Sequence, residues 1–586
     1  MTRQRLLTSF LVLVTLLLLV VSGFGQKGSE MATGTGHWSP ASSLGTARQG
    51  ACSVPLPDGN VLIAGGADTR GSLSSSELYG SDGRFTSAAP MAEARSGQAC
   101  AAVHDGTVLM AGGSAGGSTL SSAEVYNIIT GKWSPVGPLT MPRSGAAASP
   151  LIDGRVLITG GQSFGVATAT VEMYDPATRS FQTLPTKMSS PRQQHAAVSL
   201  GDGRVLIAGG SDGQSALDSV DVYDPSVQAI HPLGKMSTPR QGLSATLLLD
   251  GRVLLAGGNN GTADLASTEI FDPQTGTIAS AGSMISARQG HLSFRLPDNN
   301  EILLVGGTQN DTPLAAAEVF IPWTGVFKPV DALSMPRSGA VGAPLQQKGT
   351  LLVAGGLSVR AVTATAEAFT FATLTTDRSI YLPGQTVTIT GSRWAPGETV
   401  EIVRHGVSKP DLTLTAVADS SGNIVNSQLQ LDAGDIGVST LTAKATQSGS
   451  GAQATLTTTT TATGVSYAPG RPSTPQPYGQ TENVTGTVVS VTSAPSPLAP
   501  NPTCGTLNFY YGPNSGTVTG NTLFTSVDLS KLNPRRIPRR CRLPRTSWGW
   551  VRSSSLSSTI LLLAPLIPTV IRRASQMEGK SLWPRR

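Results

Sequence analysis

A pair of adjacent glycines recurs along the chain at a nearly constant interval. Successive pairs are 47 to 49 residues apart, beginning at positions 65, 112, 160, 209, 257, 306 and 355. One of these stretches, GDGRVLIAGGSDG at 201–213, has the glycine content of a phosphate-binding loop but lacks the Gly-Lys-Ser/Thr ending that such loops need. A ligand loop is usually singular, whereas a structural corner recurs in every unit of a repeat. The glycines therefore predict a repeat fold of seven units.

An arginine and an acidic residue recur with the same period as the glycines. An acidic residue follows each arginine after 29 or 30 residues, in the pairs Arg48/Glu77, Arg95/Glu124, Arg143/Glu172, Arg192/Asp221, Arg240/Glu269, Arg288/Glu318 and Arg337/Glu367. A fixed offset in every unit favours a structural pair over seven active sites.

Each unit is expected to form four short strands: one after the arginine, one ending at Gly-Gly, one around the acid and one around a later apolar residue. Asp-Gly pairs beginning at 58, 105, 153, 202 and 250 are typical of tight hairpins between the first two strands. Four strands make one blade of a propeller, and a period near 48 residues fits that architecture. The sequence predicts an all-β, seven-bladed β-propeller.

The combined pattern resembles the Kelch repeat. It comprises Arg-x-Gly, an apolar run into Gly-Gly, Glu-x-Tyr and a later Trp, and it covers residues 36–370. Trp38 and Trp133 keep the late Trp, whereas the other units have Phe85, Phe181, Ile230, Ile278 and Phe327. Because Trp38 precedes the first Gly-Gly and has no equivalent after Phe369, the N-terminal segment is expected to supply the outer strand of the seventh blade.

The chain beyond the repeats changes in texture. Residues 372–462 alternate apolar and polar positions between Pro-Gly turns and resemble a bacterial immunoglobulin-like β-sandwich. Residues 463–502 form a Pro/Ser/Thr-rich linker. Residues 503–530 are compatible with a partial β unit. For the basic tail at 531–586, a disordered segment, a surface-sorting signal containing LPRTS and a shifted reading frame are the three alternatives.

The N-terminus and the charge distribution bear on location and partners. Residues 1–25 have the layout of a signal peptide, with Arg3 and Arg5 before an apolar run and small residues after it. We therefore expect a secreted, periplasmic or cell-surface protein, with membrane anchoring only if the signal is uncleaved. The tail carries +12 against a total of +6, so the rest of the chain carries −6 and gives no support to nucleic-acid binding.

Four cysteines are too few for a dense disulfide framework. Cys52 and Cys100 occupy similar places in successive units, and we expect small buried thiols there rather than a bridge. The pairing of Cys504 and Cys541 is left open.

The predicted architecture also resembles galactose oxidase, in which a seven-bladed Kelch-type propeller precedes an immunoglobulin-like domain. That resemblance implies a copper site made of tyrosines and histidines. Here the propeller tyrosines share one repeat position, at Tyr79, Tyr126, Tyr174 and Tyr223, and are assigned to blade structure. His195 and His291 stand where Kelch repeats often have His, so we predict no metal, no cofactor and no catalytic residues.

A recognition role follows from the loops after Gly-Gly, which differ most between units. We expect these loops to lie on the same face as the arginine-containing connections and to bind a protein or glycan. The predicted contacts are Asp68, Arg70, Phe164, Asp212, Asn259, Asn260, Asp311 and Arg360, although each is also compatible with an ordinary solvated turn. The resulting hypothesis is an exported, non-enzymatic recognition or adhesion protein. A divergent, galactose-oxidase-like propeller enzyme is the alternative, and a structural module of the cell envelope is a third hypothesis.

Overall fold

The computed structural model describes residues 36–345, 349–406 and 408–459, together with the backbone pairing of β45 (Leu507–Tyr511) with β46 (Asn514–Val518) and of β47 (Val551–Arg552) with β48 (Ile560–Leu561). The predicted signal peptide at 1–25 and linker at 463–502 lie outside these residues, as do the partial β unit at 503–530 and the tail at 531–586 apart from the four strands just named.

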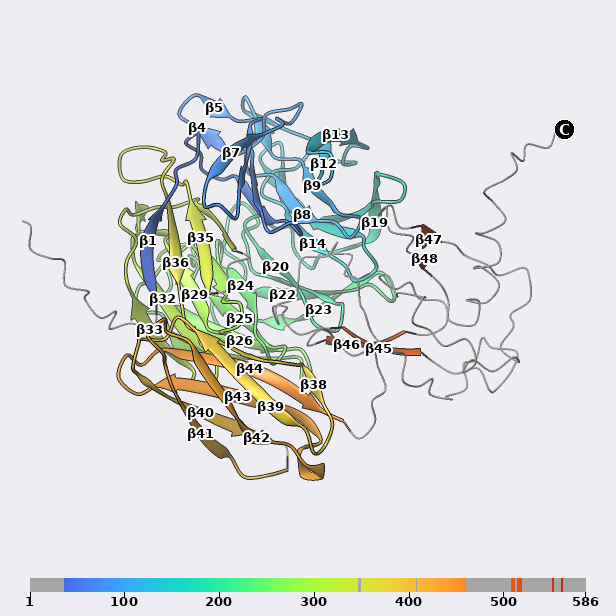
Figure 1. Cartoon of the computed structure of the whole chain (residues 1–586). Helices are drawn as coiled ribbons and strands as arrows, with labels where there is room; N and C mark the ends of the chain where they lie inside the picture. The colour runs from blue at the N-terminus through green and yellow to red at the C-terminus, as the bar shows by residue number, and fades with distance from the viewer. Residues whose placement is uncertain are drawn as a thin grey trace, which may run out of the picture.

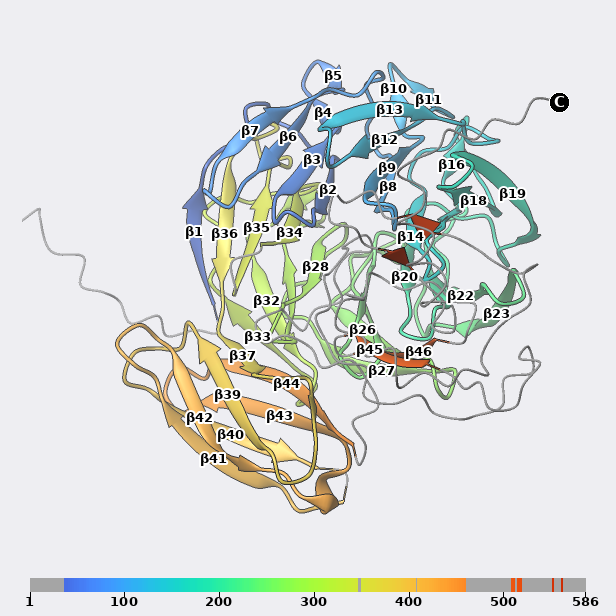
Figure 2. The ribbon, with the colours of Figure 1, turned by 45° about the vertical axis from the view of Figure 1, so that its right-hand side comes forward.

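Seven four-stranded antiparallel sheets are arranged in a ring around a central axis (Figures 1 and 2). From the innermost strand outwards, blade 1 consists of β2 (Cys52–Pro55), β3 (Val61–Ala64), β6 (Ser76–Tyr79) and β7 (Phe85–Ala88). Blade 2 consists of β8 (Ala99–Ala102), β9 (Thr107–Ala111), β12 (Ala123–Asn127) and β13 (Lys132–Val136), and blade 3 of β14 (Ala147–Pro150), β15 (Val156–Thr159), β18 (Thr170–Asp175) and β19 (Ser180–Lys187). Blade 4 consists of β20 (Ala196–Ser199), β21 (Val205–Ala208), β22 (Ser219–Asp224) and β23 (Ala229–Lys235).

Blades 5 to 7 repeat this order. They consist of β24 (Ser244–Leu247), β25 (Val253–Ala256), β26 (Ser267–Asp272), β27 (Thr277–Ser283); β28 (Leu292–Arg295), β29 (Ile302–Val305), β32 (Ala317–Ile321), β33 (Val326–Val330); and β34 (Val341–Pro344), β35 (Thr350–Ala354), β36 (Ala366–Thr370), β1 (His37–Ala41). The predicted four-strand unit is therefore confirmed.

The ring closes through the N-terminal strand. β1 pairs antiparallel with β36, and Trp38 lies opposite Phe369 with ring centroids 4.9 Å apart. The predicted use of the N-terminal segment as the outer strand of blade 7 is confirmed. Because the first and last parts of the propeller share one sheet, blades 7 and 1 meet in the same way as the other neighbours.

The apolar second strands explain why the blades stack. The run VLIA of β3 is buried along its whole length, and so are ILLV of β29 and TLLVA of β35. Strands that are covered on both faces read as continuous apolar runs rather than alternating ones. One apolar cluster of described residues lies between each pair of neighbouring blades, so the hydrophobic core consists of seven layers between sheets.

A buried arginine organises each blade. In blade 3, Nη2 of Arg143 lies 2.6 Å from Oε1 of Glu172, and Nη1 donates to the carbonyl oxygens of Gly160 and Thr170. The carboxylate also accepts from the backbone N–H of Thr140, in the connection that enters the blade. The same ion pair occurs in all seven blades at 2.6 to 3.2 Å, with both partners buried.

The Gly-Gly pair provides the contact with the next blade. The N–H of Gly161 donates to the carbonyl oxygen of Arg192, and a Cβ on Gly160 would lie 2.4 Å from that oxygen. Every blade repeats this bond, including the one from Gly356 to Arg48 across the closure. A side chain at the first glycine would push the neighbouring blade away, which accounts for the recurrence of glycine.

The cysteine prediction was wrong. Cys52 on β2 and Cys100 on β8 form a disulfide with a Cα–Cα distance of 6.4 Å, joining the innermost strands of blades 1 and 2. The two cysteines come within bonding distance because neighbouring innermost strands lie side by side around the propeller axis. Spacing of 48 residues along the chain gave no sign of this proximity.

A two-sheet unit follows the propeller. Its three-stranded sheet contains β37 (Thr373–Thr376), β39 (Thr386–Ser392) and β42 (Ile424–Gln430). The five-stranded sheet contains β38 (Ile380–Tyr381), β44 (Gly451–Thr458), β43 (Gly437–Ala445), β40 (Thr399–His405) and β41 (Leu412–Val417), and a 3₁₀ turn spans Ala433–Asp435. Its own apolar cluster is centred on Trp394 and Leu441. No helix in the described ranges is long and apolar enough to cross a membrane.

The hairpin between β28 and β29 holds the two-sheet unit against the propeller. It reads Asp-Asn-Asn-Glu at 298–301, in place of the Asp-Gly turn of the first five blades. Nδ2 of Asn299 donates to the carbonyl oxygens of Ala372 and Gly451, at 2.8 and 2.7 Å, and Asn300 bonds that of Gln453. These bonds join the hairpin to β44 and to the chain just before β37.

Glu301 ends this hairpin and is fully buried. Both of its carboxyl oxygens lack a hydrogen-bond partner, and Oε1 and the ring of Trp323 both lie beside Gly451. Burial raises the pKa of Glu301 to about 8, and the positive charge of Lys328 offsets only part of that effect. The carboxyl is therefore protonated at neutral pH in the folded protein.

The arginine ion pairs carry a first prediction. Arg143→Met leaves the Glu172 carboxylate buried without its cation and should lower the free energy of unfolding by about 3–5 kcal/mol. Arg155→Met, which removes a half-exposed pair with Asp153, should lower it by less than about 1 kcal/mol. Urea unfolding at neutral pH measures both. The double variant Arg143→Met/Glu172→Met should recover part of the loss; equal losses for Arg143 and Arg155, or no recovery, would contradict the assignment.

Glu301 carries a second prediction. Its folded pKa lies above that of an unfolded glutamate, so the folded state binds more protons and the free energy of unfolding should fall as pH rises from 5 to 8, by about 1.4 kcal/mol per pH unit. Glu301→Gln removes this contribution, so its stability relative to the parent should grow over that range. Urea unfolding at pH 5, 6, 7 and 8 measures the difference, with the exposed Glu401→Gln as control. A difference independent of pH would refute a buried neutral carboxyl.

Candidate functional site

One face of the propeller gathers the arginine connections and the loops after Gly-Gly. The residue after each blade arginine pairs with the residue after the same blade's Gly-Gly, as in Gln49 with Ala67 and Gln241 with Asn259. This face is called the upper face below; the Asp-Gly hairpins and the two-sheet unit lie at the opposite, lower end. The predicted placement of both sets of loops on one face is confirmed.

A ring of backbone surrounds the propeller axis on the upper face. Its seven members, one from each blade, are Gly50, Gly97, Gly145, Gln194, Gly242, Gly290 and Gly339. The N–H of Gly290 donates to the carbonyl oxygen of Gly242 at 2.8 Å, and four other blade boundaries show the same kind of bond. All seven residues have positive φ, including Gln194 at 53°. Nothing stands within 4 Å of a Cβ built on Gly50 or Gly145, so the backbone is uncovered at these positions.

Amide and hydroxyl side chains adjoin this ring. We call them the amide collar, which comprises Gln49, Gln193, Gln194, Gln241 and Gln289 with Ser96, Ser144 and Ser338 in the remaining blades. Oε1 of Gln289 lies near Gly242 of the preceding blade, which places this carboxamide at a blade boundary. The five glutamine side chains make no hydrogen bond within the described part of the chain. Each carboxamide thus keeps two donors and an acceptor oxygen for a ligand.

The predictions from sequence missed the amide collar. The signal lies in the residue that follows each blade arginine, which is Gln in four repeats and Ser in three. That position varies little between repeats, so a search for variable loop residues passed over it. The collar carries no charged side chain, which favours uncharged, hydrogen-bonding ligands.

Four of the predicted ligand residues serve their own turns. The carboxylate of Asp68 accepts from the N–H groups of Arg70 and Gly71 and pairs with the Arg70 guanidinium at 2.9 Å, and these bonds lower the pKa of Asp68. Asp212 caps the turn at 214–215, which likewise lowers its pKa. Oδ1 of Asn260 accepts from two backbone N–H groups, and Asn259 bonds Asp264. Much of the hydrogen-bonding capacity of these four residues is already used.

The other predicted ligand residues are more open. Phe164, between the short strands β16 (Gln162–Ser163) and β17 (Val166–Ala167), is 80% exposed and has φ of 49°. Asp311 and Arg360 are exposed on blades 6 and 7, and the paired Arg70 keeps 84% of its side chain in solvent. The eight residues share the upper face, and no hydrogen bond joins two of them across a blade boundary in the described part of the chain. Two neighbouring loop residues do make such a bond: Asp264 accepts the N–H of Asn310 and so joins the loops of blades 5 and 6.

The side chains that a copper centre would use lie apart. Tyr126 and Tyr174 are buried against Trp133 and Phe181 of the next strand, and burial raises the pKa of Tyr174 to about 12. Nε2 of His195 lies 2.8 Å from Oγ1 of Thr159, within hydrogen-bond distance. Burial, reinforced by Arg192, lowers the pKa of His195 to about 3, so the imidazole is neutral at physiological pH.

His291 repeats this arrangement two blades away, with Nε2 at 2.9 Å from Ser244 Oγ and its pKa lowered to about 3 by burial. Among the described residues, no three His, Cys, Asp or Glu side chains gather closely enough to hold a metal ion. The donor set in this part of the chain does not fit the copper centre implied by the galactose oxidase resemblance, which needs converging imidazoles.

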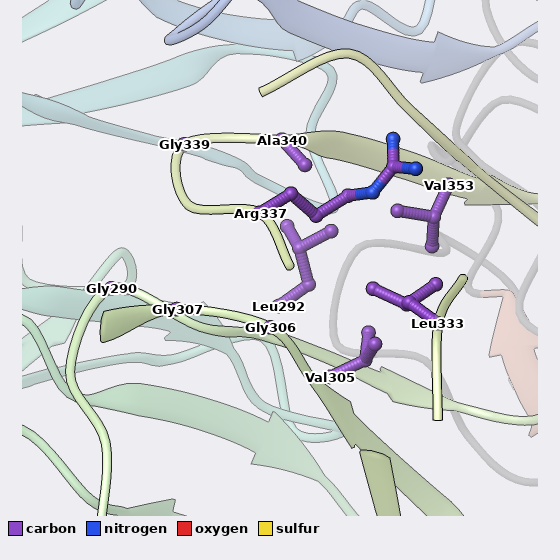
Figure 3. Close-up of a pocket in the computed structure, with 10 residues that line it drawn as sticks. All are labelled: Gly290, Leu292, Val305, Gly306, Gly307, Leu333, Arg337, Gly339, Ala340 and Val353. Carbon is purple, nitrogen blue, oxygen red and sulfur yellow. The ribbon is translucent and has the colours of Figure 1, made fainter. Parts of the chain in front are cut away.

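A pocket between blades 6 and 7 has no catalytic character either. Leu292, Val305, Leu333 and Val353 line it, with Arg337 as its charged member (Figure 3). The space between them is too narrow for a water molecule. The guanidinium of Arg337 is held by Glu367 and by the carbonyl oxygens of Gly355 and Thr365, so this arginine is part of the blade framework.

Comparison with known proteins agrees with the fold. The family described as Kelch motif matches residues 95–140, 143–188 and 191–236. Among solved structures, the chain is similar to one titled a novel fungal alcohol oxidase with catalytic diversity among the AA5 family, in complex with copper, at 17% identity and a TM-score of 0.50. That match covers 72% of this chain and 100% of the other. No curated protein matches. The chain therefore contains Kelch repeats in a propeller like those of galactose and alcohol oxidases.

Proposed function

We propose that this protein is an exported, non-enzymatic recognition or adhesion protein that binds a glycan through the upper face of its propeller. The observation that carries the proposal is the amide collar, whose five glutamine carboxamides stand around the propeller axis on the upper face without a hydrogen-bond partner in the described residues. A sugar presents many hydroxyl groups that both donate and accept hydrogen bonds. Unpaired carboxamides offer both functions and impose no charge.

The surroundings of the collar support the same ligand class. Phe164 offers an exposed aromatic ring on the loop of blade 3, and aromatic faces contribute apolar contact in largely polar binding sites. Arg360 and Asp311 stand on other loops and provide room for contacts with substituents. A protein partner is the competing ligand class, and it would contact the loop tips more than the amide collar.

The rest of the chain supports an exported location. The predicted signal peptide at 1–25 and the Cys52–Cys100 disulfide both fit a secreted, periplasmic or cell-surface protein, because disulfides persist in oxidising compartments. We propose that the two-sheet unit at 373–458 is the immunoglobulin-like module, acting as a spacer beside the lower face of the propeller.

Neutral oligosaccharides test the proposal. Purified protein should bind a subset of a neutral glycan array saturably, and isothermal titration should give a Kd at least ten times weaker for Gln241→Ala/Gln289→Ala, because two hydrogen bonds are lost at about 1 kcal/mol each. Gln182→Ala, an exposed glutamine on the outer strand of blade 3, is the matched control and should bind like the parent. Binding of a protein but no glycan, or equal affinities for all three chains, would reject the collar as a glycan site.

A galactose-oxidase-like enzyme is the second candidate function, favoured by the likeness in fold to the copper-bound alcohol oxidase. Because the His and Tyr side chains of the described propeller do not converge, we expect purified protein to retain far less than one copper per chain after loading and dialysis. Elemental mass spectrometry measures the metal, and peroxide release from primary alcohols measures turnover. Stoichiometric copper together with peroxide production would establish the enzyme and overturn the recognition proposal.

A further inference from the structure

Five hydrogen bonds join the hairpin between β28 and β29 to the two-sheet unit and to the chain just before it. Three are the side-chain bonds of Asn299 and Asn300 described above. The other two are backbone bonds. The N–H of Gln453 donates to the carbonyl oxygen of Asn299 at 2.8 Å, and the N–H of Leu374 donates to that of Asp298 at 2.7 Å. The two-sheet unit accordingly lies beside blade 6, near β33 (Figures 1 and 2).

Glu301 lies in this interface. Its side chain has no exposed surface, and neither Oε1 nor Oε2 has a hydrogen-bond partner. A Cβ on Gly451 would lie 2.9 Å from Oε1, so the glycine at the start of β44 leaves the space that the carboxyl needs. Trp323, in the turn between β32 and β33, lies beside the same glycine. The carboxyl is therefore enclosed between the propeller and the two-sheet unit.

The amide side chains of the hairpin are not free to bind an ionised Glu301. Nδ2 of Asn299 donates to two carbonyl oxygens, and its Oδ1 accepts the N–H of Glu301. Nδ2 of Asn300 donates to Gln453. An isolated buried charge costs far more than a neutral polar group, so a carboxylate in this place needs water. Water reaches Glu301 when the hairpin and β44 separate.

The charged groups of the surrounding elements leave this balance in place. They are Arg295 on β28, Asp298 in the hairpin, Lys328 on β33, Arg393 after β39 and Lys444 on β43. Lys328 is the one that acts on the pKa of Glu301, and its positive charge lowers that pKa by less than burial raises it. Arg393 bonds Thr350 of β35. Lys444 lies opposite Gly451 and is exposed.

We propose that Glu301 is a pH-sensitive switch of the interface: its protonated form holds the two-sheet unit on the propeller, and its ionisation releases that unit while both parts stay folded. The two-sheet unit has an apolar cluster of its own, which keeps it folded after release. This inference concerns the join between the two parts and does not depend on the glycan proposal.

The direction of the switch follows from proton binding. The pKa of Glu301 is about 8 in the docked state, against 4.5 for an ordinary glutamate in water. The docked state therefore binds more protons, so docking is strongest at acid pH and weakens as pH rises towards the docked pKa. One proton is involved, and the equilibrium constant for docking should fall about tenfold per pH unit between these two values.

Hydrogen–deuterium exchange of the full chain tests the switch at pH 5, 6, 7 and 8, after correction for the intrinsic pH dependence of amide exchange. Mass spectrometry with electron-transfer dissociation localises the deuterium. The N–H groups of Gln453 and Leu374 report docking, because carbonyl oxygens of the hairpin accept them. Their protection should fall about tenfold per pH unit. Protection of β15 in blade 3 and of β43 in the two-sheet unit should not fall with it.

Two variants assign the effect. Glu301→Gln keeps a neutral group of the same shape, so protection of Gln453 and Leu374 should stay constant over this pH range. Glu401→Gln removes an exposed carboxylate of the two-sheet unit and should behave like the parent. An equal loss of protection in β15 and β43 would mean global unfolding instead of release, and an unchanged slope in Glu301→Gln would assign the effect to another group; either result overturns the proposal. If Glu301→Gln fails to fold, the comparison of Gln453 with β15 in the parent still decides it.

Discussion

The blade arginine is the group on which the other features of the propeller depend. Its guanidinium holds a carboxylate on the third strand and carbonyl oxygens at the end of the second strand and the start of the third, while its own carbonyl oxygen receives the Gly-Gly N–H of the preceding blade. One residue therefore joins three strands of two sheets. The arrangement also buries a full ion pair, which is tolerated because both terminal nitrogens of the guanidinium are bonded and the carboxylate accepts further backbone bonds.

This framework separates stability from recognition. The arginines, their acids and the glycines are buried, whereas the collar glutamines stand one residue further along the chain on the open face. A ligand on that face would meet glutamine side chains that make no hydrogen bond between the described blades. The lower end is different, because there the hairpin at 298–301 joins the propeller to the two-sheet unit. The turn of this hairpin is buried.

The repeating parts of the fold could be predicted from sequence because each rests on a local, recurrent requirement. The Gly-Gly period gave the number of units, and the misplaced Trp38 gave the closure. What escaped prediction depends on proximity around the ring: Cys52 reaches Cys100 only because two innermost strands lie side by side. Glu301 looks ordinary in the sequence, since neither burial nor the lack of a partner has a pattern along the chain. The loop residues were placed correctly on one face, but the sequence could not show that Asp212 and Asn260 are occupied by their own turns.

The closure through β1 has a consequence for how the chain is made. Trp38 emerges early during synthesis, but its partner Phe369 follows more than three hundred residues later, so β1 must wait without a sheet until blade 7 exists. Contacts of such long range slow folding, and an unpaired strand can pair with a neighbouring chain in the meantime. Blades 1 and 2 can stack and form their disulfide during this interval, which leaves a partly assembled ring with one free edge at each end. The most aggregation-prone stage of this protein therefore comes before the last blade has left the ribosome.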